Sequence, residues 1–218
     1  LGKTVQALML ALYYAREWPV LVVTPATVRG VWEEHILDWL MPLVQEQHLF
    51  VAKTGKDTWP SGIKFALCSY DLLAQNKHLR RQANGKAFSV VICDEAHYIK
   101  TPTAQRTKAV LDALYHSTRS ILLTGTPIQN RASELYTIFD GLLPDLMPKF
   151  TEYAERYCNE RRVWTRRGRQ GSRWARPYVE VSWEGSKRPE ELHTMLRSSI
   201  MIRRLKKDVL SQLPPKRR

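Results

Sequence analysis

Two adjacent carboxylates, Asp94 and Glu95, directly follow a short apolar run at residues 90–93. Ligands of open α/β sheets bind beyond the carboxyl ends of the strands, so this is a suitable position for chemistry. The first carboxylate can hold Mg²⁺, and the second can polarise a water that attacks a phosphate. An isolated Asp-Glu pair is more often an acidic surface turn. However, Ala96 and His97 complete a tetrapeptide that chance seldom places after such a run, and we interpret this turn as a candidate catalytic site.

The first residues, Gly2-Lys3-Thr4, are of the types that end a phosphate-binding loop. In such a loop, backbone N–H groups and a helix start hold phosphates, the lysine reaches the β- and γ-phosphates, and the hydroxyl binds Mg²⁺. Residues 4–16 are apolar around most of a helical wheel, which predicts the buried helix that must follow. The triplet alone is a weak signal. Because the loop's first glycine and its preceding strand are missing, we expect a fragment of a longer protein.

A third segment with suitable residues runs from the strand candidate at 120–123 into Thr124, Gly125, Thr126 and Pro127. Hydroxyl and amide groups at this strand end could contact the two carboxylates and sense the state of a bound nucleotide. The alternative is a plain Gly-Pro turn, and this segment by itself does not distinguish the two.

The elements that would position these groups alternate along the first 150 residues. Short apolar strands separated by helices predict an α/β fold, with a parallel sheet covered by helices on both faces. The pattern changes near residue 144, so we expect one domain over residues 1–148 and a different region over 149–218. Strands are expected at 20–23, 48–52, 63–69, 88–93 and 120–123, and helices at 4–16, 28–40, 72–81, 103–116, 131–142, 190–200 and 202–210.

The charge of the chain is concentrated in its last third. The 218 residues carry 34 Lys and Arg against 21 Asp and Glu, a net charge of +13. Residues 1–150 hold 16 basic and 13 acidic side chains, whereas residues 151–218 hold 18 and 8. Such a basic region indicates a polyanion as partner.

Arg and Trp are interleaved over residues 161–176 without a clear period. Guanidinium groups pair with phosphates, and Trp can stack on an exposed base. One interpretation of this segment is therefore a nucleic-acid contact through Arg166, Arg167 and Arg169. The alternative is a solvated surface loop.

Composition excludes several classes of protein. Hydrophobic residues make up 44% of the chain and charged residues 25%, a balance that excludes wholesale disorder. The chain has no apolar run long enough for a membrane span, and its start does not read as a signal peptide, so we expect no secretion. Cys68, Cys93 and Cys158 are odd in number and far apart, which argues against a disulfide framework or a zinc cluster and suits a reducing compartment. We expect all three to be unreactive core thiols. Trp32 and Trp39, seven apart on one helix, are expected in the core.

In their order, these motifs resemble those of the Swi/Snf-type DNA translocases of helicase superfamily two. The resemblance covers nearly the whole chain, and the segments at 125–130 and 201–216 are highly specific to the family. A finer likeness to the annealing helicases, the HARP-like subgroup, rests on residues 17–19, 156–159, 183–192 and 205–215. The matching segments are 2–6, 24–29 with Trp32, 69–71, 94–100, 123–130, 134–136, 201–210 and 213–216.

The resemblance implies a RecA-like lobe of the P-loop NTPase type with a basic helical C-terminal extension. It also implies ATP and Mg²⁺ as cofactors and duplex or branched DNA as the partner. Nucleotide contacts are implied for Gly2, Lys3, Thr4, Gln6, Asp94, Gly125 and Thr126, Mg²⁺ binding for Thr4 and Asp94, and catalytic roles for Lys3, Asp94 and Glu95. DNA contacts are implied for Arg29, Ser69, Arg203 and Arg204, besides Arg166, Arg167 and Arg169.

The sequence departs from the family pattern at both ends. The phosphate loop is truncated, the upstream glutamine motif is absent, and so is the second motor lobe that supplies an arginine finger. Because such a finger contributes several orders of magnitude to the rate, we expect these 218 residues alone to hydrolyse ATP poorly.

Two alternatives stay open: the lobe of a DEAH-box RNA helicase, and a catalytically incomplete platform that binds DNA or protein. For any of these activities we expect the nucleus in a eukaryote and the cytoplasm or nucleoid in a bacterium.

Overall fold

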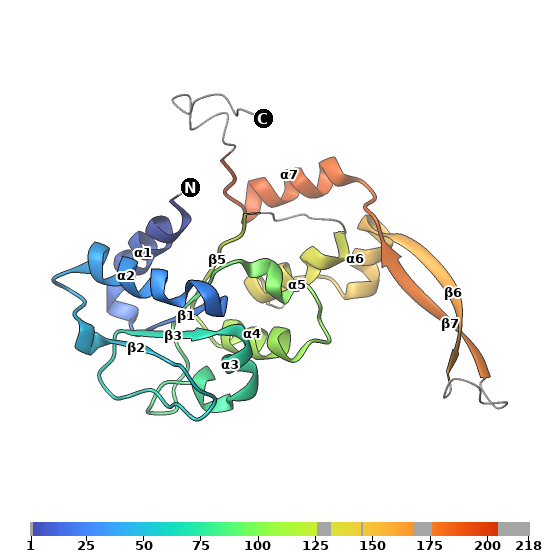
Figure 1. Ribbon diagram of the computed structural model, residues 1–218. Helices are drawn as coiled ribbons and strands as arrows, with labels where there is room; N and C mark the ends of the chain where they lie inside the picture. Colours follow the sequence, from blue (N-terminus) through green and yellow to red (C-terminus); the bar gives the residue numbers. More distant parts are fainter. Residues whose placement is uncertain (1, 126–131, 145, 168–175, 205–218) are drawn as a thin grey trace, which may run out of the picture. The chain divides into compact units, whose positions relative to one another are not determined.

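The computed structural model describes residues 2–125, 132–144, 146–167 and 176–204 (Figure 1). The chain divides into two compact units, Leu1–Phe150 and Thr151–Arg218. The first unit holds the sheet that the sequence predicts, and the second holds most of the basic residues.

Five parallel strands form the sheet of the first unit, in the order β2-β3-β1-β4-β5. All five correspond to strands expected from the sequence, so the predicted α/β fold with a parallel sheet is confirmed. Because the pairs are parallel, the carboxyl ends of all five strands lie at one edge of the sheet. The strands are β1 (Val20–Thr24), β2 (Leu49–Val51), β3 (Phe65–Ser69), β4 (Val90–Cys93) and β5 (Arg119–Leu122).

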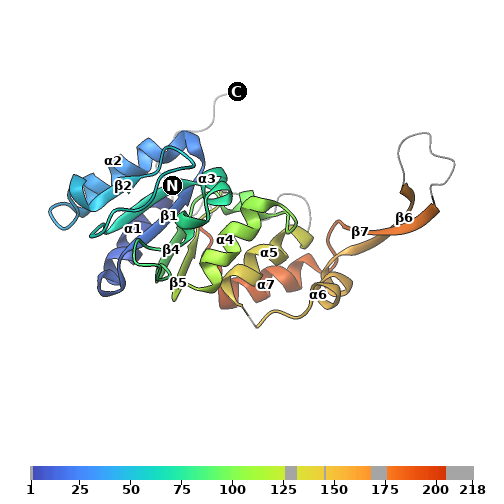
Figure 2. The same cartoon turned by 90° about the horizontal axis from the view of Figure 1, so that it is seen from below.

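Helices cover the sheet. In the first unit these are α1 (Lys3–Tyr13), α2 (Arg29–Leu40), α3 (Tyr70–Gln75), α4 (Gln105–Tyr115) and α5 (Ala132–Leu142), and α6 (Phe150–Tyr157) begins at its end. Short 3-10 helices lie at Ala15–Glu17, Ala26–Val28, Glu46–His48, Lys77–Arg80 and Ala96–Ile99. Helices α1 and α2 pack side by side (Figure 1), and α4 lies alongside α5 (Figure 2).

The core follows from the period-2 alternation of the buried strands. Val20 and Val22 of β1 face a cluster with Leu8 of α1 and Trp32 and Ile36 of α2. The strand residues between them are buried on the other face, where α3 contacts β1 and β3. Strands buried on both faces read as continuous apolar runs, which is why the sequence identified them.

The prediction that Trp32 and Trp39 both lie in the core is wrong for Trp39. Its side chain is 53% exposed, whereas that of Trp32 is 1% exposed. The buried positions of α2 are Trp32, Ile36 and Leu40, four residues apart. With 3.6 residues per turn, a stripe that steps by four rotates around the helix and leaves Trp39 at its margin.

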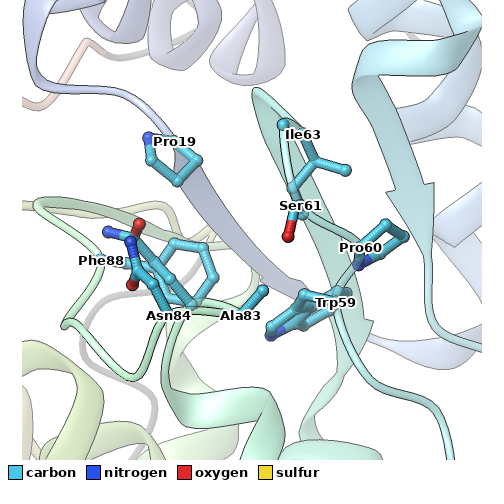
Figure 3. A pocket seen from close by; sticks show the side chains of 10 residues that line it. Pro19, Trp59, Pro60, Ser61, Ile63, Ala83, Asn84 and Phe88 are labelled. Carbon is cyan, nitrogen blue, oxygen red and sulfur yellow. The ribbon is translucent and has the colours of Figure 1, made fainter.

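A pocket of about 220 Å³ opens at the amino-terminal edge of the sheet (Figure 3). Pro19 comes just before β1, Pro60 and Ile63 precede β3, and Asn84 and Phe88 precede β4. The pocket therefore lies at the edge opposite to the strand ends that carry the candidate catalytic residues.

The second unit corrects the prediction of a basic helical extension, because its Arg-rich segment, expected to be irregular, contains strands. Two strands, β6 (Asn159–Arg167) and β7 (Arg176–Glu184), pair antiparallel and form a ribbon (orange in Figure 1). Val179, Val181 and Trp183 alternate with polar residues, as strands do, but the surrounding arginines obscured this period.

The helices of the second unit were predicted only in part. The helix expected at 190–200 is present as α7 (Pro189–Ser199). Of the helix expected at 202–210, residues 202–204 have no regular structure and the rest lie outside the described residues. Helix α6, whose Tyr153, Ala154 and Tyr157 are buried at helical spacing, was missed because Pro144 and Pro148 suggested an irregular region.

Candidate active site

The carboxyl edge of the sheet brings together the residues that the sequence selected for chemistry. Asp94 and Glu95 follow β4, Gly125 lies three residues beyond β5, and Lys3 begins α1. Three segments that are far apart in the sequence therefore meet at one place, as expected for a site at the strand ends of a parallel sheet.

The carboxylate of Asp94 is firmly held. The alternation of β4 turns its side chain to the face covered by α1 and α2, and the residue is 9% exposed. Its Oδ1 accepts a hydrogen bond from the Glu95 backbone N–H at 2.9 Å, and its Oδ2 accepts one from the Trp32 indole at 2.9 Å. Its backbone is fixed as well, since its N–H donates to Val23 O at 2.8 Å and its carbonyl accepts from the Tyr70 hydroxyl at 2.6 Å.

Glu95 turns away from the strand because its backbone is left-handed, with φ 49° and ψ 53°. This conformation is uncommon for a residue with a side chain, and such residues cluster at functional sites. The turn places Oε1 3.9 Å from Lys3 Nζ. Oε2 accepts from the Gly125 backbone N–H at 3.5 Å and lies 3.3 Å from His97 Nδ1. The carboxylate is thus turned toward α1 and the end of β5.

The approach of Lys3 to Gly125 is close. A Cβ at Gly125 would lie 3.6 Å from Lys3 Nζ, so the ammonium group lies directly over the backbone of this residue. Thr124 Oγ1 is 3.5 Å from His97 Nδ1, which also links this strand end to the turn after β4. Thr126, predicted to take part in the same contacts, lies outside the described residues.

The start of α1 has the geometry of a helix that follows a glycine turn. Gly2 has φ 68°, a conformation that glycine adopts without strain, and its carbonyl accepts from the Gln6 N–H at 3.0 Å. Thr4 is half-buried in the first turn, and the side chain of Gln6 is exposed. These positions suit phosphate binding at a helix N-terminus.

Mg²⁺ fits this set of donors. The part of the chain that the structure describes holds no group of three or more His, Cys, Asp or Glu side chains that could bind a metal alone. Mg²⁺ usually needs fewer protein ligands, because one or two protein oxygens are combined with substrate phosphates and waters. The Asp94 carboxylate and the Thr4 hydroxyl are the oxygen donors that the sequence predicted for this role.

Groups around the site are kept in their neutral forms. Burial, followed by the nearby acidic groups, raises the pKa of Tyr70 well above its ordinary value. Burial also raises the pKa of the Cys68 thiol to about 12 and raises that of Cys93. Both thiols are therefore unreactive core groups, as predicted for them.

The residues with predicted DNA contacts lie in different places. Arg29 is half-buried, and its guanidinium donates to the backbone carbonyls of Ala26 and Ala52. Ser69 is 4% exposed, and its hydroxyl caps α3 by accepting from the Leu72 N–H at 3.3 Å. Ser69 thus has a structural role that the sequence did not predict.

The other predicted DNA residues belong to the second unit. Arg166 and Arg167 are strand residues of β6 that pair with Pro177 and Arg176 of β7. Arg203 and Arg204 are exposed in the segment after α7, and Arg169 lies outside the described residues.

Sequence reasoning missed the polar roles of Trp32 and Tyr70. Trp32 was expected only to pack in the core, and the hydroxyl of Tyr70 had no assigned partner. Both donate to Asp94, which is 62 and 24 residues away respectively. A local pattern does not reveal which buried N–H or O–H reaches a distant carboxylate.

The comparison with family models decides the classification. All 218 residues match the model of the SNF2-related domain. The chain belongs to the SNF2-related family. This confirms the resemblance to Swi/Snf-type proteins on which the sequence analysis relied.

The similar curated proteins of this family include annealing helicases. The chain is 38% identical over its whole length to the SWI/SNF-related matrix-associated actin-dependent regulator of chromatin subfamily A-like protein 1 of Xenopus tropicalis. It is 40% identical over 99% of its length to the DNA annealing helicase and endonuclease ZRANB3 of Bos taurus. It spans only 21% and 19% of these relatives.

A solved structure has a similar fold. The Sulfolobus solfataricus SWI2/SNF2 ATPase core in complex with dsDNA matches 72% of the SNF2-related chain and 32% of its own, with a TM-score of 0.60 and 27% identity. The parallel sheet flanked by helices is therefore that of part of a SWI2/SNF2 ATPase core.

Proposed function

We propose that this SNF2-related chain is the ATP-binding lobe of a DNA-dependent ATPase that moves along DNA and remodels or reanneals it. The observation that carries the proposal is the convergence of Lys3, Asp94, Glu95 and Gly125 at the carboxyl edge of the sheet. Family membership and the likeness to a SWI2/SNF2 ATPase core support it.

Each residue at this edge has chemistry that suits one part of ATP hydrolysis. Lys3 and the backbone of Gly2 would bind the phosphates, and Thr4 and Asp94 would hold Mg²⁺. The metal ion supplies neutralisation of the charge that develops on the transferred phosphate. Glu95 would orient the attacking water, and Gly125 with Thr126 would couple the nucleotide site to DNA. Gln6, whose side chain is exposed, is a further nucleotide-binding candidate.

The pair formed by Lys3 and Glu95 is compatible with these roles. The two charged atoms are 3.9 Å apart, and both side chains are about one third exposed, with values of 35% and 34%. Such a pair is weak in water. A phosphate group can therefore draw Lys3 away from Glu95 at little cost, which frees the carboxylate to accept from a water.

DNA is the partner that the basic second unit favours. Relatives are named as regulators of chromatin and DNA annealing helicases, and the similar ATPase core was solved with dsDNA. We assign the phosphate contacts to Arg29, Ser69, Arg203 and Arg204 together with the arginines of β6 and the adjoining Arg169.

Fast turnover would also need an arginine finger from a second motor lobe. A nuclear location is proposed in a eukaryote and a cytoplasmic or nucleoid one in a bacterium.

The experiment that tests the proposal compares nucleic acids as activators. ATP turnover by the full-length protein is measured with duplex DNA, forked DNA and structured RNA of matched length. We expect duplex or forked DNA to stimulate turnover well above RNA. Stimulation by RNA equal to that by DNA would instead favour an RNA helicase, and nucleotide binding without any turnover would favour a binding platform.

A further inference from the structure

Among the residues that the structure describes, one donor holds each oxygen of the Asp94 carboxylate. Trp32 Nε1 donates to Oδ2 and the Glu95 N–H to Oδ1, both at 2.9 Å. A carboxylate oxygen has two lone pairs. Each oxygen therefore keeps one lone pair for a metal ion or a metal-bound water, while the rotation of the carboxylate is restricted from both sides.

Trp32 is a rigid donor. It is 1% exposed and packs in a core cluster with Leu8, Val20 and Ile36, so its ring cannot turn without disturbing the packing between α2 and the sheet. The indole N–H can donate but cannot accept. Its direction is thus fixed by the core, and a carboxylate oxygen is the partner that it orients.

Tyr70 supports the same residue from the opposite face of the sheet. Its hydroxyl donates to the Asp94 carbonyl at 2.6 Å, and the residue is 2% exposed. Aromatic donors from α2 and α3 therefore fix the side chain and the main chain of Asp94 respectively.

We infer that Trp32 is a positioning residue that holds the Asp94 carboxylate in the orientation required to bind a nucleotide-associated Mg²⁺. The inference rests on the proposed ATP-binding function and adds a residue to its site. Groups that hydrogen-bond to a metal ligand orient it, and their loss typically lowers metal affinity by about 10- to 100-fold.

The test measures how much Mg²⁺ the full-length protein needs to bind methylanthraniloyl-labelled ATP. One variant is Trp32→Phe, and another replaces Trp32 by benzothienylalanine, which keeps the shape of the ring and lacks the N–H. We expect half-saturation to need about 10- to 100-fold more Mg²⁺ in both, with unchanged nucleotide affinity in excess EDTA. Trp39→Phe, on the exposed side of the same helix, is the matched control and should behave like the natural protein.

A double variant shows whether Trp32 acts through Asp94. Combined with Asp94→Asn, the Trp32 replacement should raise the Mg²⁺ requirement no further than Asp94→Asn does alone. The inference is overturned if the folded benzothienylalanine variant needs the same Mg²⁺ as the natural protein, or loses nucleotide affinity equally with and without Mg²⁺. A natural protein that binds no nucleotide would overturn the proposed function itself.

Discussion

Glu95 and Asp94 are adjacent in sequence but have different surroundings. Asp94 directly follows β4 and is buried beside α2, whereas Glu95 has a left-handed backbone conformation and is one third exposed. The difference follows from the left-handed backbone of Glu95, because this conformation points its carboxylate in a different direction from that of Asp94. Asp94, Glu95 and Lys3 could be selected as candidate site residues from the sequence, because each lies in a short recognisable motif. The indole of Trp32 could not, because its role depends on a contact across 62 residues.

The buried thiol of Cys68 predicts a loss of stability at alkaline pH. Burial raises its pKa from 9.0 to about 12 in the folded protein. Between these values the unfolded chain binds fewer protons, so the contribution of this group is complete below pH 9 and decreases as pH rises toward 12. Between the two pKa values, the contribution of this thiol to the free energy of unfolding should fall by about 1.4 kcal/mol per pH unit.

Urea unfolding from about pH 8 to pH 11 measures this dependence. The free energy of unfolding of Cys68→Ala should decrease less steeply with pH over that range than that of the natural protein. Equal slopes in the two proteins would show that the thiol does not titrate as its burial requires.

Strands and helices were predictable where one chemical pattern dominates. The five strands of the sheet are short and apolar. Because they pair in parallel, their carboxyl ends meet at one edge of the sheet. The β6–β7 ribbon was not predicted, because seven arginines between residues 161 and 176 obscured the alternation of Val179, Val181 and Trp183. A two-stranded ribbon gains little from sheet formation alone, so its sequence also carries a weaker signal.

Ser69 shows how a residue at a strand end can stabilise the next helix. Its hydroxyl accepts from the Leu72 N–H at 3.3 Å, so Ser69→Ala should lower the free energy of unfolding by about 0.5–2 kcal/mol. Ser69→Thr, which keeps the hydroxyl, should retain most of that stability. Chemical denaturation of both variants checks this, and equal stability of Ser69→Ala and the natural protein would contradict the capping role.

The molecule as a whole combines a nearly neutral first unit with a strongly basic second unit. Residues 1–150 carry a small excess of positive charge, and most of the net charge of +13 lies in residues 151–218. The chain spans about a fifth of the curated relatives that it matches. The activity and DNA preference of the relatives' whole length could therefore not be predicted from the chain.

Replacing Arg166, Arg167 and Arg169 together by Ala should weaken DNA binding similarly for all sequences. Each phosphate contact that is lost should reduce the slope of log affinity against log salt by about 0.9. Binding titrations at several salt concentrations measure this slope. Lys53, Lys56 and Lys77, which are exposed in the first unit, form the control triplet. An unchanged slope in the arginine variant would identify this segment as a solvated surface.

Glu95→Gln in the full-length protein shows whether the turn after β4 catalyses ATP hydrolysis. This change keeps the size of the side chain and removes the carboxylate that faces Lys3 and Gly125. We expect DNA-stimulated turnover to fall about 100- to 10,000-fold while labelled ATP still binds with nearly natural affinity. Turnover within a few-fold of the natural protein would show that Glu95 has no catalytic role in ATP hydrolysis.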